Sequence, residues 1–145
     1  MTKKVITATA EMHIKKAADL LMKYRIHGLP VINKNREILG IVTEVDFFSK
    51  NGDNLYLPQY ISLLQKVNVS QFDSRKQKTY LKKIQEAKIA DIMTINCICL
   101  NQDSSINEAI EIFKKNNFNI LPIINNQKKL VGIVSLSDLF KLIKK

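Results

Sequence analysis

The sequence predicts a mixed α/β fold made of two copies of a β-α-β-β-α unit, with a helical insert between them. Three observations predict it: an internal repeat at the two ends of the chain, short apolar runs that alternate with amphipathic segments, and a middle stretch of different pattern. With 46% hydrophobic residues among 145, the chain can build a core, so a wholly disordered protein is excluded.

The repeat is found by matching each of residues 1–53 to the residue 92 positions later, which needs no gap and yields 15 identities over 53 positions. The identities include Leu29-Pro30 with Leu121-Pro122, Gly40-Ile41-Val42 with Gly132-Ile133-Val134, and Asp46 with Asp138. A unit of about 50 residues buries too little apolar area to be stable alone. We therefore expect repeat 1 (1–53) and repeat 2 (93–145) to pack sheet against sheet with pseudo-two-fold symmetry, flanking an insert (54–92).

Each repeat is expected to open with a short alternating strand, at 5–9 and 97–100, followed by an amphipathic helix. The apolar helix faces are Ile14, Ala17, Ala18, Leu21 and Met22 in repeat 1, and Ile106, Ala109, Ile110 and Phe113 in repeat 2. Ser105 and Glu108 have the spacing of a capping box, which predicts where the second of these helices begins.

Two strands joined by a polar turn come next, at 29–33 and 38–42 in repeat 1 and at 121–125 and 130–134 in repeat 2. Their continuous apolar runs predict strands that are buried on both faces. A further helix is expected to begin near Thr43 and near Ser135. The insert is predicted to be helical, with Pro58 in a first turn and two apolar stripes.

Charge and composition exclude several classes of protein. The net charge of +10 is spread along the chain and only three of the 23 basic residues are Arg, so a dedicated nucleic-acid-binding protein is disfavoured. No apolar run reaches the roughly 18–20 residues of a membrane span, and the N-terminal residues lack a signal-peptide core. Two cysteines, Cys97 and Cys99, give no disulfide framework, which favours a cytoplasmic protein.

No catalytic or metal-binding set is found in the sequence. The chain has two histidines, no cysteine or histidine at metal-ligand spacing near Cys97 and Cys99, and no glycine-rich phosphate loop among its four glycines. We therefore expect neither an enzyme nor a metal protein.

The junction between the second hairpin strand and the following helix is the candidate binding site, and it occurs twice. Thr43 precedes Asp46 by three residues, as Ser135 precedes Asp138. One interpretation is a helix capping box, which any helical protein can contain. The other is a ligand site, because a carboxylate can accept hydrogen bonds from ribose hydroxyls and a helix N-terminus offers N–H groups to a phosphate.

Residues 28–32 and 39–46 resemble a CBS domain, and so do residues 119–124 and 130–138. The stretch 89–94 is similar to the lead-in that usually precedes such a domain. Two copies in tandem resemble a Bateman module, a regulatory unit that binds an adenosine-containing ligand such as AMP, ADP, ATP or S-adenosylmethionine. The resemblance also implies a homodimer and a regulated partner protein.

The resemblance implies two clefts between the repeats, each built from both. The first cleft would use Thr43, Asp46, Ile98, Phe118 and Asn119, and the second Ser135, Ser137, Asp138, Ile6, Ile26, His27 and Gly28. By the same resemblance the two aspartates hold ribose hydroxyls, Thr43 and Ser135 contact ribose or phosphate, the backbone near Ile98 or Ile6 meets adenine, and His27 with Arg25 meets a phosphate.

Two departures from the family pattern predict that the clefts are unequal. Asn119-Ile120 stands where repeat 1 has His27-Gly28, and Met1-Thr2 aligns within the lead-in at 89–94, so the lead-in of repeat 1 is expected to be missing from a fragment or an unusually short chain. The cleft that uses Ile6 would then lack part of its wall. A ligand-free interaction or dimerisation module, and less favourably a basic nucleic-acid binder, remain alternative functions.

Overall fold

The structure, a computed structural model, describes residues 1–47, 82 and 85–143. Pro58 and most of the two apolar stripes of the predicted insert lie outside these residues. The described elements of repeat 1 are α1 (Ile14–Tyr24), β1 (Gly28–Ile32), β2 (Ile38–Thr43) and the 3-10 helix η1 (Glu44–Phe47). After the insert come α4 (Ile89–Ile92), β3 (Thr94–Ile95), β4 (Leu100–Asn101), α5 (Ile106–Asn116), β5 (Ile120–Ile124), β6 (Leu130–Ser135) and α6 (Leu136–Ile143).

The four hairpin strands lie within one residue of their predicted bounds, but the first strand of each repeat is shorter than predicted. In repeat 1 it is a single parallel bridge from Ala8 to Val31, and in repeat 2 it is β4, which pairs parallel with β5. In repeat 2 the residues before β4 connect it to β3, which belongs to the other sheet, and the chain takes a left-handed conformation at Asn96, whose φ is 54°. The expected helix after Thr43 is the 3-10 turn η1 within the described residues, whereas α6 begins directly after Ser135 as predicted.

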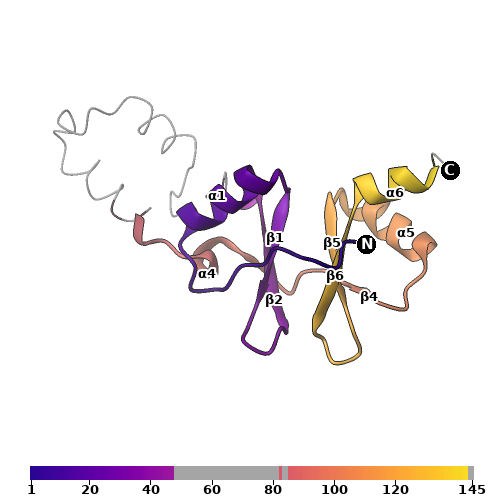
Figure 1. Ribbon diagram of the computed structural model, residues 1–145, viewed down its shortest axis with the longest axis horizontal. Coiled ribbons are helices and arrows are strands. Elements are labelled where there is room, and N and C mark those ends of the chain that lie inside the picture. The colour runs from indigo at the N-terminus through magenta and orange to yellow at the C-terminus, as the bar shows by residue number, and fades with distance from the viewer. Residues whose placement is uncertain (48–81, 83–84, 144–145) are drawn as a thin grey trace.

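The two three-stranded sheets exchange an edge. β3 belongs in sequence to the lead-in of repeat 2, yet it pairs antiparallel with β2, so that Thr94 lies opposite Ile41. At the equivalent place in repeat 2, Thr2 bridges Ile133 through N–H to carbonyl bonds of 2.9 and 3.0 Å. Each repeat therefore completes the sheet of the other, and the N-terminus lies beside repeat 2 (Figure 1).

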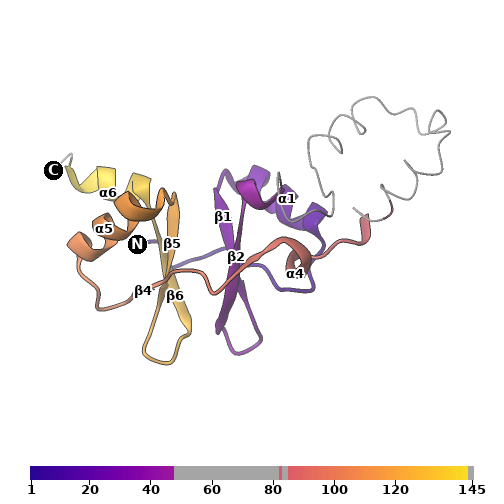
Figure 2. The same cartoon turned by 180° about the vertical axis from the view of Figure 1, so that it is seen from behind.

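The hairpin turns demonstrate the pseudo-two-fold relation. Arg36 and Lys128, at equivalent positions, both have left-handed backbones, with φ of 64° and 59°. The turns also meet, because the Ile38 N–H donates to the Lys128 carbonyl at 3.4 Å and the Leu130 N–H donates to the Arg36 carbonyl at 2.9 Å. These reciprocal hydrogen bonds join the two hairpin ends, which lie side by side in both views (Figures 1 and 2).

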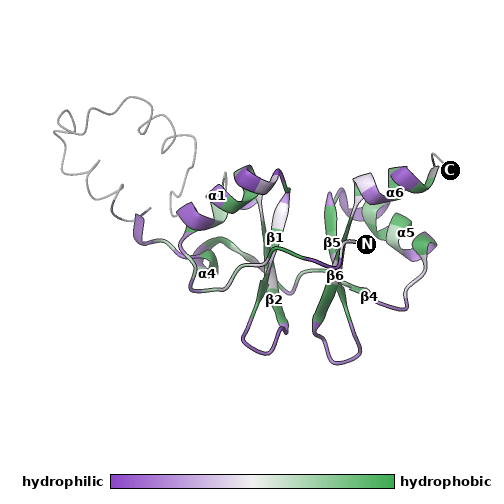
Figure 3. Ribbon diagram, in the orientation of Figure 1, coloured by the Kyte–Doolittle hydropathy of each residue, from purple (hydrophilic) through white to green (hydrophobic). Residues whose placement is uncertain are grey.

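The core consists of two clusters, one in each repeat, formed between the sheet and its outer helices. Hydrophobic residues predominate along the strands, whereas the hairpin turns are hydrophilic (Figure 3). Three side chains depart from the predicted burial: Met22 and Ile106 on the helix faces, and Leu39 in β2, are exposed. Helical periodicity places Met22 beside the buried face, but burial depends on what covers that face, and β2 is covered on only part of its length.

A candidate ligand cleft between the two repeats

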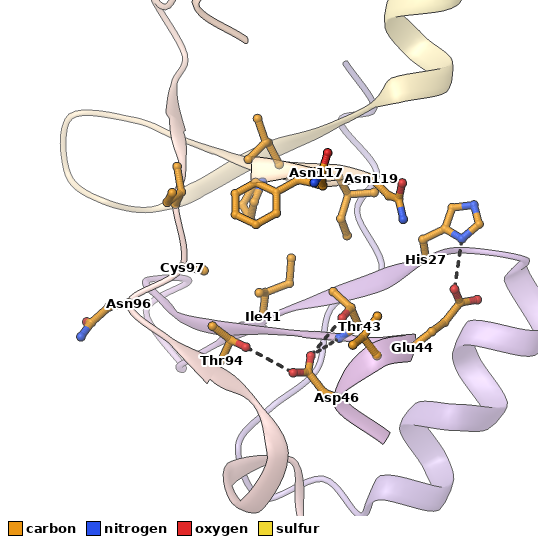
Figure 4. A pocket seen from close by; sticks show the side chains of 16 residues that line it. His27, Ile41, Thr43, Glu44, Asp46, Thr94, Asn96, Cys97, Asn117 and Asn119 are labelled. Carbon is orange, nitrogen blue, oxygen red and sulfur yellow. Dashed lines mark hydrogen bonds and ion pairs between the residues drawn. The ribbon is translucent and has the colours of Figure 1, made fainter. Parts of the chain in front are cut away.

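A cavity of about 370 Å³ lies between the repeats. Its lining comes from the end of β2 and η1, from the segment between β3 and β4, and from the start of β5. Figure 4 shows Thr43, Asp46 and Thr94 on one side of the cavity, with Asn117 and Asn119 opposite. All five residues of the first predicted cleft, Thr43, Asp46, Ile98, Phe118 and Asn119, line it.

The polar wall is organised by the Asp46 carboxylate. Asp46 Oδ2 accepts hydrogen bonds from the Thr43 backbone N–H at 2.7 Å and from the Thr43 hydroxyl at 3.1 Å. Asp46 Oδ1 accepts from the Thr94 hydroxyl at 3.2 Å, which reaches it from the exchanged strand β3. The residue is only 5% exposed. Asp46 thus forms its half of the predicted capping box, by accepting the Thr43 backbone N–H, and the same carboxylate borders the cavity.

The opposite wall is largely apolar. Phe118, Ile120 and Pro122 enter from the start of β5, and Ile98 enters from the segment before β4 with 43% of its surface exposed. Asn117 ends α5 in a left-handed conformation, φ 52°, which asparagine tolerates better than most residues and which turns the chain into β5. A flat ring can lie against such side chains while its polar edges meet backbone and amide groups.

A contact between a histidine and a carboxylate borders the cleft. His27 Nδ1 lies 3.3 Å from Glu44 Oε2, with both side chains more than half exposed, and both residues line the cavity. The resemblance assigned His27 to the second cleft, whereas in the structure it borders the first. The two repeats approach closely beside it, since a Cβ on Gly28 would lie 2.6 Å from Ile120 Cδ1.

The two cysteines lie beside this cleft, and Cys97 lines it. The Cys97 and Cys99 sulfur atoms are 3.8 Å apart. The hydrogen bond from the Cys99 thiol lowers the pKa of Cys97 below its ordinary value. The same contact, together with burial, raises the pKa of Cys99. Because Cys97 lines the cleft, the accessibility of its thiol can report on a molecule bound there.

The residues of the second predicted cleft are distributed differently. The Asp138 carboxylate accepts from the Ser135 N–H at 3.0 Å and from its hydroxyl at 3.2 Å, and it lies 3.7 Å from Lys141 Nζ. Asp138 lines a separate cavity within repeat 2, without Ile6, Ile26, His27 or Gly28. Ser137 is exposed, Gly28 is buried, and Ile6 and Ile26 pack against the core of repeat 1.

Several lining residues were not anticipated from the sequence, above all Thr94, Asn117 and Cys97. Thr94 was visible as part of the lead-in motif, but the motif alone does not show that it reaches the carboxylate of the other repeat. Within the part of the chain that the structure describes, no group of three or more His, Cys, Asp or Glu side chains is placed to hold a metal ion. Among the same residues, no helix has the length and apolarity needed to cross a membrane.

The family model of the CBS domain matches residues 1–51 and 89–145. The chain belongs to the CBS domain family. It contains two copies of the domain, with the mixed α/β fold of a tandem CBS pair. Protein MJ1426 of Methanocaldococcus jannaschii is 31% identical over 144 residues, covering 96% of this chain and 86% of that protein.

Other relatives carry the CBS pair within a longer chain or alone. Inosine-5'-monophosphate dehydrogenase of the same archaeon is 26% identical over 141 residues, and the match spans 96% of this chain but 22% of the enzyme. The structure of CBSX2 of Arabidopsis thaliana in complex with AMP superposes with a TM-score of 0.72 at 20% identity, covering 100% and 95% of the two chains. The CBS pair of protein MJ0100, in complex with 5-methylthioadenosine and S-adenosyl-L-methionine, superposes with a TM-score of 0.67 at 24% identity, covering 98% and 93%.

Proposed function

We propose that this CBS pair is a regulatory module that binds an adenosine-containing ligand in the cleft between its repeats. The observation that carries the proposal is the cavity of about 370 Å³, which has a carboxylate on one wall and apolar side chains on the other. CBS pairs of the same fold hold AMP in CBSX2 and methylthioadenosine with S-adenosylmethionine in MJ0100, which supports the same ligand class here.

The ribose is assigned to Asp46. Its two hydroxyl donors, from Thr43 and Thr94, lie at 3.1 and 3.2 Å, which is longer than the usual O–H···O distance of about 2.7–2.8 Å. The Thr43 backbone N–H at 2.7 Å is the tighter bond. Ribose hydroxyls can donate to the Asp46 carboxylate in place of the threonine hydroxyls, while the Thr43 backbone bond keeps the carboxylate in position.

The adenine is assigned to the apolar wall, between Ile98 and Phe118, with Asn119 near its polar edge. Charge then discriminates among adenosine compounds. Among the described residues that line the cavity there are two carboxylates, Asp46 and Glu44, and neither a lysine nor an arginine. A triphosphate meets unfavourable charge in such a cleft, whereas the sulfonium of S-adenosylmethionine or the neutral methylthioadenosine does not. We expect these last two to bind more tightly than ATP.

Isothermal titration with adenosine, methylthioadenosine, S-adenosylmethionine, AMP and ATP tests the proposal. Asp46→Asn should weaken binding at least about 10-fold, which corresponds to about 1.4 kcal/mol. The matched control is Asp138→Asn, at the equivalent position of repeat 2, which should leave the affinity unchanged. Because Asp46 also caps η1, Ile98→Asp is a second variant: its side chain is 43% exposed, so it should fold normally and still lose the ligand.

Alkylation of Cys97 by iodoacetamide is an independent readout, because this thiol lines the cleft. A bound ligand should slow its modification in the wild type and not in Ile98→Asp. The absence of heat and of protection with all five compounds at millimolar concentration would reject the ligand and leave the interaction module as the function.

Binding can regulate only if the ligand has different affinities for two arrangements of the protein. We propose no catalytic reaction for the chain. A homodimer and a regulated partner protein belong to the same proposal, as does the predicted cytoplasmic location. Sedimentation of the protein with and without ligand measures whether assembly is the property that changes.

A further inference from the structure

The two cysteines of the chain form a pair beside the ligand cleft. Cys97 lines the cavity, whereas Cys99 lies outside its lining. Their sulfur atoms are 3.8 Å apart, and the Cys99 thiol donates to the Cys97 carbonyl oxygen at 3.5 Å. Both residues are partly exposed, so a small reagent can reach the pair.

The pair lies on the segment that connects the two sheets. β3 ends at Ile95 and pairs with β2 of repeat 1, whereas β4 begins at Leu100 and pairs with β5 of repeat 2. Residues 97–99 between them belong to no helix or strand. Figure 4 shows Cys97 on this segment, beside the cavity. The backbone of these three residues can therefore change its conformation without disrupting a helix or a strand.

A bond between the two sulfur atoms would be short-lived rather than permanent. Sulfur atoms in a disulfide are about 2.05 Å apart and the Cα atoms about 4.4–6.8 Å apart. Cα atoms two positions apart in an extended chain are separated by about 6.6 Å, near the upper end of that range. The ring that encloses a single residue is therefore strained, and strained disulfides are readily reduced and serve as regulatory rather than structural bonds.

We propose that Cys97 and Cys99 are a modification site at which a low-molecular-weight disulfide forms a reversible Cys97–Cys99 bond that weakens ligand binding. This inference rests on the proposed function, since it concerns the regulation of the same cleft. Ile98 is the residue that the bond encloses, and its side chain lines the cleft. Closing the ring changes the backbone at Ile98 and moves this side chain away from the place assigned to adenine.

The reaction is a thiol–disulfide exchange in two steps. The Cys97 thiolate attacks one sulfur of the external disulfide, forms a mixed disulfide and releases one small thiol. The Cys99 thiolate then attacks Cys97 Sγ, forms the Cys97–Cys99 bond and releases the second small thiol. Two protein thiols are oxidised and one external disulfide is reduced to two thiols, so hydrogen atoms and electrons balance. The hydrogen bond that lowers the pKa of Cys97 favours this thiol as the first to attack.

Oxidation and ligand binding must influence each other equally. If the disulfide weakens binding about 10-fold, a saturating ligand stabilises the dithiol form by the same factor. For this two-electron couple a factor of ten corresponds to about 30 mV, by which the ligand should make the reduction potential of the pair more positive.

The first test identifies the product and needs no ligand. The reduced full chain is incubated with oxidised glutathione and examined by mass spectrometry without reduction. The wild type should lose two hydrogen atoms within the peptide that holds both cysteines, whereas Cys99→Ser should retain one glutathione on Cys97. Glutathione retained on the wild type, or a disulfide between two chains, would overturn the proposal.

The second test measures the effect on the cleft, again without ligand. Amide chemical shifts of the isotope-labelled chain should differ between the reduced and oxidised forms at Thr43 and Phe118, and not at Ala17 in the core of repeat 1. Dithiothreitol should restore the spectrum of the reduced form. Differences confined to residues 97–99 would mean that the bond does not act on the cleft, and the proposal would be wrong.

The third test is titration with S-adenosylmethionine. The oxidised chain should bind it at least about 10-fold more weakly than the reduced chain, and reduced Cys99→Ser should bind it as the reduced wild type does. Equal affinities of the two forms would contradict the proposal. If the reduced chain binds none of the five adenosine compounds, the proposed function is rejected, and the chemical shifts at Thr43 and Phe118 still decide whether the disulfide acts on the cleft.

Discussion

Repeat 1 and repeat 2 share the Thr/Ser-x-x-Asp motif, yet the two aspartates lie in different surroundings. Asp46 is 5% exposed and receives a donor from Thr94, a residue of the exchanged strand β3. The Asp138 side chain is 23% exposed, and its hydrogen bonds come from Ser135 within its own repeat. The motif supplies the local cap in both repeats, whereas the third hydrogen bond of Asp46 comes from a residue that the other half of the chain contributes.

The largest difference in the cost of equivalent substitutions is expected at Ile14, which α4 covers, and at its equivalent Ile106. Ile14→Ala should lower the free energy of unfolding by about 2–4 kcal/mol, because it leaves a cavity in a covered cluster. Ile106→Ala should cost less than about 1 kcal/mol, because most of that side chain is in solvent. Urea denaturation of the two variants measures both values. Equal losses would mean that Ile106 is covered in solution.

A smaller difference is expected at the two glycines beneath the exchanged edges. A Cβ on Gly40 would collide with the backbone carbonyl of Thr94, whereas a Cβ on Gly132 would meet Met1 Sδ at 2.7 Å, the end of a flexible side chain, and the Thr2 carbonyl oxygen at 3.3 Å. Gly40→Ala should cost about 1–3 kcal/mol as overpacking. The loss of stability in Gly132→Ala should be only a few tenths of the loss in Gly40→Ala. Thermal unfolding compares them, and a greater loss in Gly132→Ala would contradict the looser contact at Gly132.

The smallest difference concerns the caps. Asp46→Ala leaves three donors without their carboxylate in a buried place, at about 2 kcal/mol, whereas Asp138→Ala removes a more exposed cap at about 1 kcal/mol. Denaturation in the absence of ligand measures these values. In a double-mutant cycle, Asp46→Ala should lower the free energy of unfolding less in the Thr94→Val background than in the wild type. Equal losses in the two backgrounds would show that the hydrogen bond from Thr94 contributes nothing.

The hairpins were predictable because their strands are continuous apolar runs and an asparagine begins each turn. Asn33 and Asn125 both accept backbone N–H bonds through Oδ1, the local device that turn residues of this type supply. The left-handed Arg36 and Lys128 were not predictable, since long side chains are uncommon there. Each of them closes a hairpin turn through a local hydrogen bond, from the Arg36 N–H to the Asn33 carbonyl and from the Lys128 N–H to the Asn125 carbonyl, and such turns require a left-handed residue there.

The candidate site was predictable only where it is local. The spacing of Thr43 and Asp46 predicts the hydrogen bonds between them. Thr94 lies 48 positions from Asp46 and reaches it through strand pairing, which no periodicity in the sequence predicts. Ile106 has the same helical spacing as Ile14, so the sequence pattern assigns both to a buried face. Their burial differs because a separate segment covers one and not the other.

The bridge between Thr2 and Ile133 has a consequence for biosynthesis. A ribosome adds about 5–20 residues per second, so the N-terminal residues emerge many seconds before the strand that they join. For part of that interval the edge strand β2 of repeat 1 also has no partner, because residues 94 and 95 have not yet been synthesised. The nascent first half therefore emerges without its final neighbours, and the pairing of Thr2 with Ile133 can form only after β6 has been synthesised.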